Sequence, residues 1–159
     1  MSRCIIFVFS GTGNTYRVAQ NIKEQMELNE VEAVLLNIEE IDELPDVSEY
    51  DYLGLGYPVY SWGMPTNVLE FAKSLPNAKQ GQKCFVFATY GGAGLYAIKE
   101  GADILKEKGY QVLRSRGFKM PENFTISFIG KLADNTEEGK KKLLEKADNE
   151  IPGYVKKIL

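Results

Sequence analysis

The chain has 159 residues, 44% of them hydrophobic, and its 19 basic and 22 acidic residues give a net charge of −3. This length suits one compact domain over residues 1–159 that buries about 70% of its unfolded surface, and it is too short for two domains. The mild acidity argues against general affinity for nucleic acid. The sequence has no apolar stretch of about 18 residues and no signal-peptide layout, so we expect a cytoplasmic protein without membrane insertion.

Histidine is absent, and the two cysteines are Cys4 and Cys84. The lack of histidine excludes Ser-His-Asp and Cys-His catalysis and most zinc sites. The cysteines are too far apart in sequence for a Cys-x-x-Cys redox pair or an iron–sulfur motif, and each opens an apolar run, so we expect buried structural thiols and no metal site. Any chemistry is therefore expected to come from a bound cofactor rather than from catalytic side chains.

Apolar, β-branched and aromatic runs alternate with helical patterns along the chain. Strands are predicted at residues 4–9, 31–38, 52–57, 84–90 and 111–118, and helices at residues 15–28, 65–75, 95–108 and 137–159. Runs such as 5–9 and 85–88 are apolar at every position, which indicates strands buried on both faces of a parallel sheet. We predict a doubly wound α/β fold, a five-stranded parallel sheet in a three-layer α/β/α sandwich.

Two long connections interrupt this alternation. Residues 39–51 hold seven acidic residues and no basic one, and we expect at most a short helical turn there. Two interpretations of this acidic connection stay open, a solvated connection or a docking face for a basic redox partner. Residues 115–134 indicate an extended irregular passage before the last helix, which we expect to border the site through Asn123.

A small, hydroxyl-rich loop directly follows the first predicted strand. It reads, in order, Ser10, Gly11, Thr12, Gly13, Asn14 and Thr15. The two glycines allow a tight turn with inward N–H groups, the start of the next helix adds partial positive charge, and the hydroxyls add donors. The loop lacks the lysine of a nucleoside triphosphate P-loop, and Tyr16 stands where a dinucleotide fingerprint needs its third glycine. The pattern predicts a site for a phosphate monoester held by neutral donors.

This loop resembles the Thr/Ser-x-Thr-Gly-x-Thr loop of flavodoxins. Ser10, Thr12, Gly13 and Thr15 fill the matching positions. The resemblance implies that the loop binds the 5′-phosphate of FMN without a counter-charge. The alternative interpretation is a Ser/Thr/Gly turn that only caps the following helix.

Two further loops follow the third and fourth predicted strands. In a doubly wound sheet they meet the phosphate loop at the carboxyl edge, where ligands bind. Both are dense in aromatic residues and glycine, which suits a flat ring whose polar rim is contacted by backbone groups. The residues expected to hold the isoalloxazine ring of FMN are Pro58, Val59, Tyr60, Ser61, Trp62 and Gly63 in the first loop and Thr89, Tyr90, Gly91, Gly92, Ala93 and Gly94 in the second.

Trp62 is the only tryptophan, and we expect it to stack on the flavin or lie at its edge, with packing over the next helix as the alternative. Flavodoxins often have Trp-Gly in this loop, and the resemblance implies that the Gly63 carbonyl accepts the N5–H of the half-reduced flavin. Here Pro65 stiffens the exit of the loop and the usual acidic neighbour is missing, which argues against a strongly lowered potential. Tyr90 and then Tyr96 are candidates for the opposite face of the ring, with burial in the core as the alternative.

The order of strand, phosphate loop and two ring loops resembles the flavodoxin-like FMN-binding family over almost the whole chain, which implies the strand order 2-1-3-4-5. Segments 57–65 and 120–124 are most similar to the flavodoxin domain of proteins with a C-terminal ferredoxin-type module. The chain has no paired cysteine clusters for such a module, so a free-standing relative and an isolated first domain are both compatible with it. A signalling receiver domain shares the strand order, but its acidic pocket is missing.

The resemblance implies a flavodoxin-like electron carrier with noncovalently bound FMN and no catalytic residue. It also implies a redox protein partner, either ferredoxin or a reductase, and we expect a monomer or a weak dimer. The alternative is a flavodoxin-fold FMN oxidoreductase, such as an NAD(P)H/quinone reductase or a protoporphyrinogen-oxidising enzyme. In that case Tyr60 and Tyr96 are expected to border the substrate.

Overall fold

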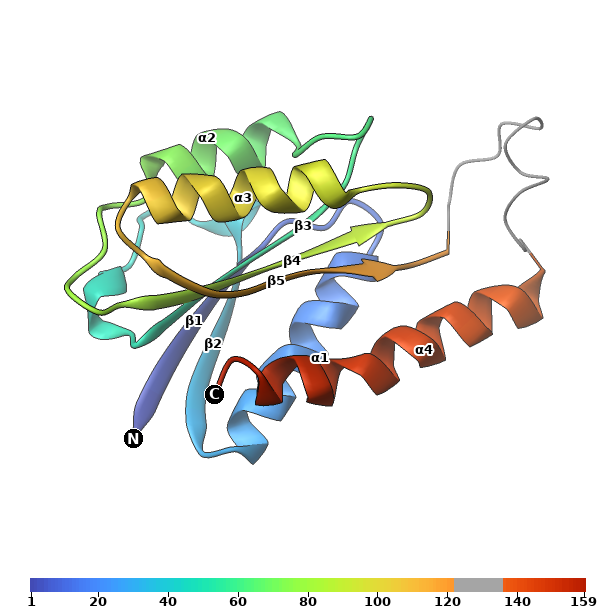
Figure 1. Cartoon of the computed structure of the whole chain (residues 1–159), viewed down its shortest axis with the longest axis horizontal. Coiled ribbons are helices and arrows are strands. Elements are labelled where there is room, and N and C mark those ends of the chain that lie inside the picture. The colour runs from blue at the N-terminus through green and yellow to red at the C-terminus, as the bar shows by residue number, and fades with distance from the viewer. Residues whose placement is uncertain (122–135) are drawn as a thin grey trace.

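The computed structural model describes residues 1–121 and 136–159, which form five parallel strands in the order β2-β1-β3-β4-β5 (Figure 1). The strands are β1 (Ser2–Val8), β2 (Val31–Asn37), β3 (Tyr52–Pro58), β4 (Lys83–Tyr90) and β5 (Gln111–Lys119). The α-helices are α1 (Asn14–Leu28), α2 (Thr66–Ser74), α3 (Leu95–Glu107) and α4 (Glu137–Lys156). Each predicted strand and helix is present, and the predicted strand order is confirmed.

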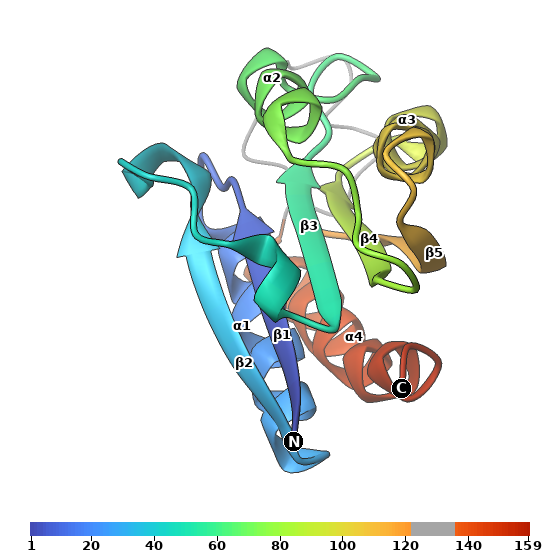
Figure 2. The ribbon, with the colours of Figure 1, turned by 90° about the vertical axis from the view of Figure 1, so that its left-hand side faces the viewer.

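The sheet lies between two helix layers, as predicted. Figure 2 shows α1 and α4 on one face of the sheet and α2 and α3 on the other. Along β1, Cys4, Ile6 and Val8 pack into the core beneath α1 and α4, whereas Ile5 and Phe7 pack into the core beneath α2 and α3. All five side chains are fully buried, because a strand covered on both faces needs apolar residues at every position.

Two glycines of β3 make room for two phenylalanine rings of β4. A Cβ on Gly54 would lie 2.5 Å from Cζ of Phe85, and a Cβ on Gly56 would lie 2.1 Å from Cζ of Phe87. Both distances are too short for a real Cβ contact, so any side chain here forces the rings to move. The close packing of these rings on β3 holds the central strands together, and the two loops that follow β3 and β4 start from this rigid base.

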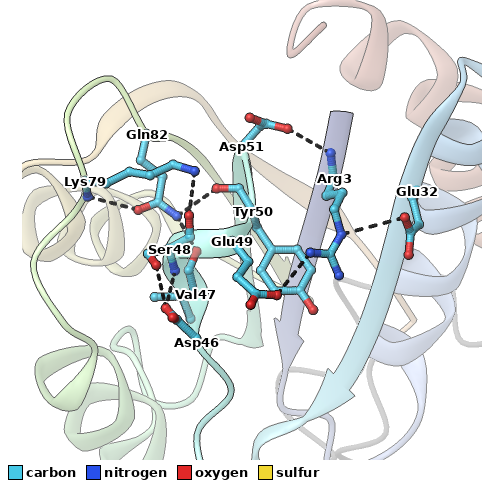
Figure 3. A network of polar contacts seen from close by, with 10 residues as sticks. All are labelled: Arg3, Glu32, Asp46, Val47, Ser48, Glu49, Tyr50, Asp51, Lys79 and Gln82. Carbon is cyan, nitrogen blue, oxygen red and sulfur yellow. Dashed lines mark hydrogen bonds and ion pairs between the residues drawn. The ribbon is translucent and has the colours of Figure 1, made fainter. Parts of the chain in front are cut away.

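The β2–β3 connection contains only two short 3-10 helices, η1 (Ile38–Glu40) and η2 (Val47–Glu49), as the sequence predicts. Its second half is fastened to the amino end of the sheet by side chains from elsewhere in the chain (Figure 3). The buried Gln82 donates through Nε2 to the carbonyls of Val47 (2.7 Å) and Tyr50 (3.0 Å). The Arg3 guanidinium forms an ion pair with Glu49 (3.2 Å) and lies over the Tyr50 ring. These contacts supply the anchoring that a longer helix would otherwise provide.

One sequence prediction is wrong in part. The strand predicted at residues 111–118 is confirmed, because β5 continues to Lys119 and pairs with β4 as far as Tyr90, so the irregular passage expected from residue 115 overlapped this strand and is wrong for residues 115–119. Asn123 lies outside the described residues. Within residues 1–121 and 136–159, no helix has the length and apolar character needed to cross a bilayer.

Both cysteines are buried, as predicted. Cys4 lies on β1 and Cys84 on β4, and neither forms a disulfide. Burial raises the pKa of the Cys84 thiol to about 12 and raises that of Cys4 as well, because a thiolate loses its hydration inside the protein. Both thiols therefore stay protonated at neutral pH and act as small apolar side chains.

Candidate functional site

The carboxyl ends of β1, β3 and β4 bring the three predicted loops to one edge of the sheet. Figure 1 shows the loops after β3 and β4 at the same end of the molecule. Backbone bonds link the loop bases: the Phe9 N–H donates to the Gly56 carbonyl (3.0 Å), and the Val59 N–H donates to the Thr89 carbonyl (2.8 Å). The three segments, far apart in sequence, therefore form one continuous surface, as expected for the ligand-binding edge of a doubly wound sheet.

The loop between β1 and α1 has the geometry of an anion cradle. Gly13 adopts a left-handed conformation (φ +94°) and directs the chain into α1, so that the first N–H groups of the helix face the loop. The Ser10 Oγ accepts hydrogen bonds from the N–H groups of Gly13 (3.1 Å) and Tyr16 (3.2 Å). The nearest base in the sequence, Arg17, pairs with Asp148 on α4 (2.6 Å). Arg17 is therefore engaged with α4, and the donors identified beside the loop among the described residues are neutral.

The hydroxyls of this loop lie at different depths. Thr12 is exposed, and the Ser10 side chain is half-buried. Thr15 is only 1% exposed, and its Oγ1 lies 2.7 Å from Oγ1 of Thr89, which is 4% exposed. The Thr15 hydroxyl thus lies beneath the loop and joins it to the end of β4.

Tyr60 lies beside the loop between β1 and α1, although the sequence predicted that it would contact the flavin ring. Its ring contacts Phe9 edge to face, with centroids 6.3 Å apart. A Cβ on Gly11 would lie 2.3 Å from the Tyr60 hydroxyl oxygen, so this glycine allows the phenol to approach the loop backbone. The Tyr60 hydroxyl therefore adds a further donor beside the cradle.

The β3–α2 loop contains a strained turn. The backbones of Tyr60 and Gly63 exchange two hydrogen bonds (3.0 and 2.9 Å), so the Gly63 carbonyl already accepts the Tyr60 N–H. The two residues between them have positive φ, +46° at Ser61 and +73° at Trp62, as in a type I′ turn that normally contains glycine or asparagine. A left-handed tryptophan is costly, and such strain is concentrated at functional sites. The turn directs Trp62 outward, with 72% of the residue exposed.

Trp62 borders a pocket of about 390 Å³ that lies against the β4–α3 loop. This size is within the range of small-molecule sites. The lining residues are Trp62, Tyr90, Gly92, Ala93, Gly94, Leu95 and Tyr96. None of them is charged, and three are aromatic.

The glycines around this pocket are needed for close contact. A Cβ on Gly94 would lie 2.9 Å from Cγ2 of Val59, so the two loops touch at this point. A Cβ on Gly117 of β5 would lie 2.6 Å from Cε1 of Tyr90. Tyr90 therefore packs against β5 while it also lines the pocket, but it is only half-buried and belongs to neither core cluster.

Five of the predicted site residues line the pocket: Trp62, Tyr90, Gly92, Ala93 and Gly94. Residues 10–15 form the cradle loop with Tyr60 beside it, and Pro58, Val59 and Thr89 lie at the bases of the loops and join them. Ser61 and Gly63 belong to the strained turn, and neither they nor Gly91 are among the residues that line the pocket. Sequence reasoning did not include Leu95, which is 83% exposed in the first turn of α3 and lines the pocket. The sequence feature that could have identified Leu95 is its position directly after Gly94, in the first turn of a predicted helix, where a large apolar residue is not needed for the core.

These features fit FMN. The donors beside the cradle are the exposed Thr12 hydroxyl and the N–H groups of Gly13 and Tyr16, which in this structure donate to Ser10 Oγ and which a phosphate oxygen would have to take over. The pocket offers an uncharged aromatic lining for a flat ring. The close approaches at Gly11 and Gly94 leave no space for a side chain at either end. The donor chemistry at one end and the lining at the other are those that the two parts of this cofactor need.

Comparison with known proteins agrees with this architecture. A family model described as flavodoxin domain matches residues 5–110. A flavodoxin from the domain Archaea is 20% identical and superposes with a TM-score of 0.62 over 98% of this chain and 99% of its own. Flavodoxin 2 from Bacillus cereus is 20% identical, with a TM-score of 0.69 over 99% of each chain.

A larger protein contains the same fold as one part of its chain. Rubredoxin oxygen:oxidoreductase from Desulfovibrio gigas is 18% identical, with a TM-score of 0.65 over 98% of this chain but only 36% of that chain. At these identities the superpositions show the fold alone. No curated protein sequence matches the chain.

Proposed function

This chain belongs to the flavodoxin domain family, and we propose that it transfers electrons through an FMN held at the carboxyl edge of β1, β3 and β4. The observation that carries this proposal is the joining of an uncharged anion cradle to an uncharged aromatic pocket at that edge. FMN has one anionic end and one flat redox-active end, and it supplies the redox chemistry when bound.

The chain's own residues divide the binding between them. The N–H groups at the start of α1 and the Ser10 and Thr12 hydroxyls are assigned to the phosphate. Trp62 and Tyr90 are assigned to the two sides of the ring, and the Gly92–Ala93 backbone to its polar edge. The Gly63 carbonyl already accepts the Tyr60 N–H. This hydrogen bond would have to break before the carbonyl could turn to accept a hydrogen bond from the ring. The turn therefore opposes that rearrangement.

A second function is supported by the rim of the pocket. Leu95 (83% exposed) and Tyr96 (72% exposed) extend the apolar lining outward, where an aromatic substrate such as a quinone has room to contact the ring. The chain would then be an FMN-dependent oxidoreductase of the quinone reductase or protoporphyrinogen-oxidising type. Electron transfer to a protein partner needs no such extension.

The acidic β2–β3 connection supports a redox partner with a basic surface, such as a ferredoxin reductase. Its first half places Glu39, Glu40, Asp42 and Glu43 in exposed positions just after the carboxyl end of β2, and no ion pair links them to the part of the chain that the structure describes. The second half of the connection is held to the amino end of the sheet by the contacts of Arg3 and Gln82 (Figure 3). Only the first half is therefore assigned to docking, at the same edge as the cradle.

The proposed function is tested by loading the purified chain with FMN, removing the excess and reducing it stepwise under anaerobic conditions. Retention of one FMN per chain and reduction in two separate one-electron steps, with exchange of electrons with ferredoxin, is the result expected for a carrier. Steady turnover of a quinone with a nicotinamide donor would favour the oxidoreductase. A folded chain that does not retain FMN would contradict both.

The docking assignment has its own test. Replacing the four exposed acids together by Gln or Asn should slow electron exchange with a basic partner and reduce its dependence on ionic strength. Glu137→Gln/Glu138→Gln at the start of α4 is the control, because it removes exposed acids away from β2. Equal rates in both variants would contradict the docking assignment while leaving FMN binding intact.

A further inference from the structure

Thr89, at the end of β4, contacts both of the other loops of the site. Its carbonyl accepts the Val59 N–H from the β3–α2 loop (2.8 Å). Its hydroxyl oxygen lies 2.7 Å from that of Thr15, at the start of α1. Thr89 directly precedes Tyr90, the last residue of β4, after which the β4–α3 loop begins. One residue therefore joins the cradle, the strained turn and the ring pocket.

The alternation of side chains along β4 explains why Thr89 reaches α1. Phe85 and Phe87 belong to the core beneath α1 and α4, and Thr89 lies two residues further on the same face. On the opposite face, Val86 and Ala88 belong to the core beneath α2 and α3. The Thr89 hydroxyl thus meets the first turn of α1 where that helix leaves the cradle.

The Thr15–Thr89 contact is sheltered from water. Thr15 is 1% exposed and Thr89 is 4% exposed, so neither hydroxyl has ready access to solvent as a substitute partner. A buried hydroxyl that loses its partner is destabilised by the full cost of its desolvation. The two residues therefore hold each other at a fixed distance, and with them the cradle and the end of β4.

We propose that Thr89 is a positioning residue that sets the distance between the phosphate cradle and the ring pocket through its hydroxyl bond to Thr15. This inference rests on the proposed function, because it concerns a ligand that spans both parts of the site. The two ring loops are joined by the Thr89 carbonyl, which a side-chain substitution leaves in place. The hydroxyl therefore controls only the position of the cradle relative to those loops.

This division predicts different effects on two ligands. FMN occupies the cradle and the pocket together, whereas riboflavin lacks the phosphate and occupies only the pocket. Thr89→Val keeps the shape of the side chain and removes the hydroxyl. We expect it to weaken FMN binding about tenfold, while riboflavin binding changes less than about twofold. Thr89→Ser keeps the hydroxyl and should bring FMN binding back to within about threefold of wild type.

The experiment measures FMN and riboflavin dissociation constants by flavin fluorescence for the wild type, Thr89→Val, Thr89→Ser, Thr15→Val and the double valine variant. Each titration is accompanied by a thermal unfolding curve of the same sample. Val86→Ala is the matched control, because it weakens the same strand on the opposite face without touching the hydroxyl pair. It should change the ratio of the two dissociation constants by less than about twofold.

The inference is supported if Thr89→Val raises the dissociation constant of FMN but not that of riboflavin. The double variant should then bind FMN no more weakly than the single variant that binds it more weakly, since both single changes break the same bond. Equal weakening of FMN and riboflavin, or additive losses in the double variant, would overturn it. Should Thr89→Val not fold, Thr89→Ala removes the same hydroxyl and is compared with Thr89→Ser, because Thr15 itself belongs to the cradle loop. Failure of the wild type to bind either flavin would instead overturn the proposed function.

Discussion

The two ends of the sheet are built on different principles. At the amino end, charged and amide side chains are engaged with one another and with the backbone: Arg3 with Glu49, and Gln82 with the β2–β3 connection (Figure 3). At the carboxyl end, the three loops that follow β1, β3 and β4 contain no charged residue, Trp62 is exposed, and Ser61 and Trp62 adopt positive φ within one turn. The contacts at the amino end stabilise the fold, although Glu30 there also has a positive φ (+61°). At the carboxyl end the positive φ falls on the exposed Trp62 beside a pocket, as is common at functional sites.

This separation has a physical basis. Among residues 1–121 and 136–159, no buried side-chain nitrogen or oxygen lacks a hydrogen-bond partner, so the described polar core is satisfied. The Ser61–Trp62 turn costs about 1–3 kcal/mol for each residue held in a sparsely populated conformation, and such a cost persists only where the surrounding structure stabilises the fold. Substitutions at the amino end should consequently change mainly the stability of the fold, whereas substitutions at the carboxyl end should change mainly the affinity for FMN.

The largest effect on stability is expected at the amino end. Gln82→Leu leaves the buried carbonyls of Val47 and Tyr50 without their donor, and we expect a loss of about 3 kcal/mol in the free energy of unfolding with little change in FMN affinity. Urea denaturation and FMN titration measure the two quantities. The neighbouring, exposed Gln80→Leu is the control and should change the stability by less than about 0.5 kcal/mol. A parallel loss of FMN affinity in Gln82→Leu would show that the two ends are not independent.

The next effect is on binding at the carboxyl end. In Gly11→Ala, the new Cβ would lie 2.3 Å from the Tyr60 hydroxyl oxygen, so the exposed phenol must leave the cradle. We expect FMN binding to weaken by about tenfold, equal to about 1.4 kcal/mol, while unfolding changes by less than about 1 kcal/mol. Gly153→Ala in α4, where a Cβ meets nothing within 4 Å, serves as the control and should leave binding unchanged. Unchanged FMN affinity in Gly11→Ala would remove Tyr60 and Gly11 from the site.

Substitution in the strained turn is expected to have smaller effects, which raise the stability of the fold but lower the affinity for FMN. Trp62→Gly relieves the positive φ and should stabilise the fold by about 0.5–1 kcal/mol, because glycine adopts this conformation without steric cost. The same change removes the indole from the pocket and should weaken FMN binding. Ser61→Gly relieves strain but keeps the indole, so it should stabilise the fold and leave FMN affinity unchanged. Tighter FMN binding by Trp62→Gly would contradict the role assigned to the indole.

The smallest effect is a pH dependence at the amino end. The hydroxyl and the N–H of Ser48 donate to the Asp46 carboxylate and lower its pKa below the ordinary value of 3.8. A carboxyl whose pKa is lower in the folded state stabilises the fold above its unfolded pKa, and this contribution is lost as the pH falls through the folded pKa. The stability difference between wild type and Asp46→Ala should therefore be constant at neutral pH and shrink below about pH 4. A constant difference down to about pH 2 would contradict this assignment.

The order of the elements could be predicted from sequence because each depends on local pattern. The apolar runs of β1, β3 and β4 and the glycine-rich phosphate loop are contiguous, so the elements and the position of the site followed from them, whereas the strand order was implied by the family resemblance. The function of the acidic connection could not be resolved in the same way. Its two halves have similar composition, and only the long-range contacts of Arg3 and Gln82 separate the anchored half from the exposed one.

The finer structure of the site also depends on contacts between distant residues. The pairing of Thr15 with Thr89 joins residues 74 positions apart, and the placement of Tyr60 over Gly11 depends on a turn with positive φ at residues that rarely adopt it. Propensity argues against Trp62 in a left-handed conformation, so sequence reasoning could predict that Trp62 lies in the site but not how the turn presents it. Such departures from local preference are expected at functional sites.

The most direct test of the account is a titration of the FMN-free chain with FMN, followed by the fluorescence of Trp62. The chain has one tryptophan, so its emission reports this loop alone. A ring bound in the pocket lined by Trp62 should quench that emission in a saturable way that ends at one FMN per chain. Saturable binding without quenching would place the flavin elsewhere, and a folded chain whose tryptophan emission and flavin fluorescence both stay unchanged would contradict the assignment of this edge to FMN.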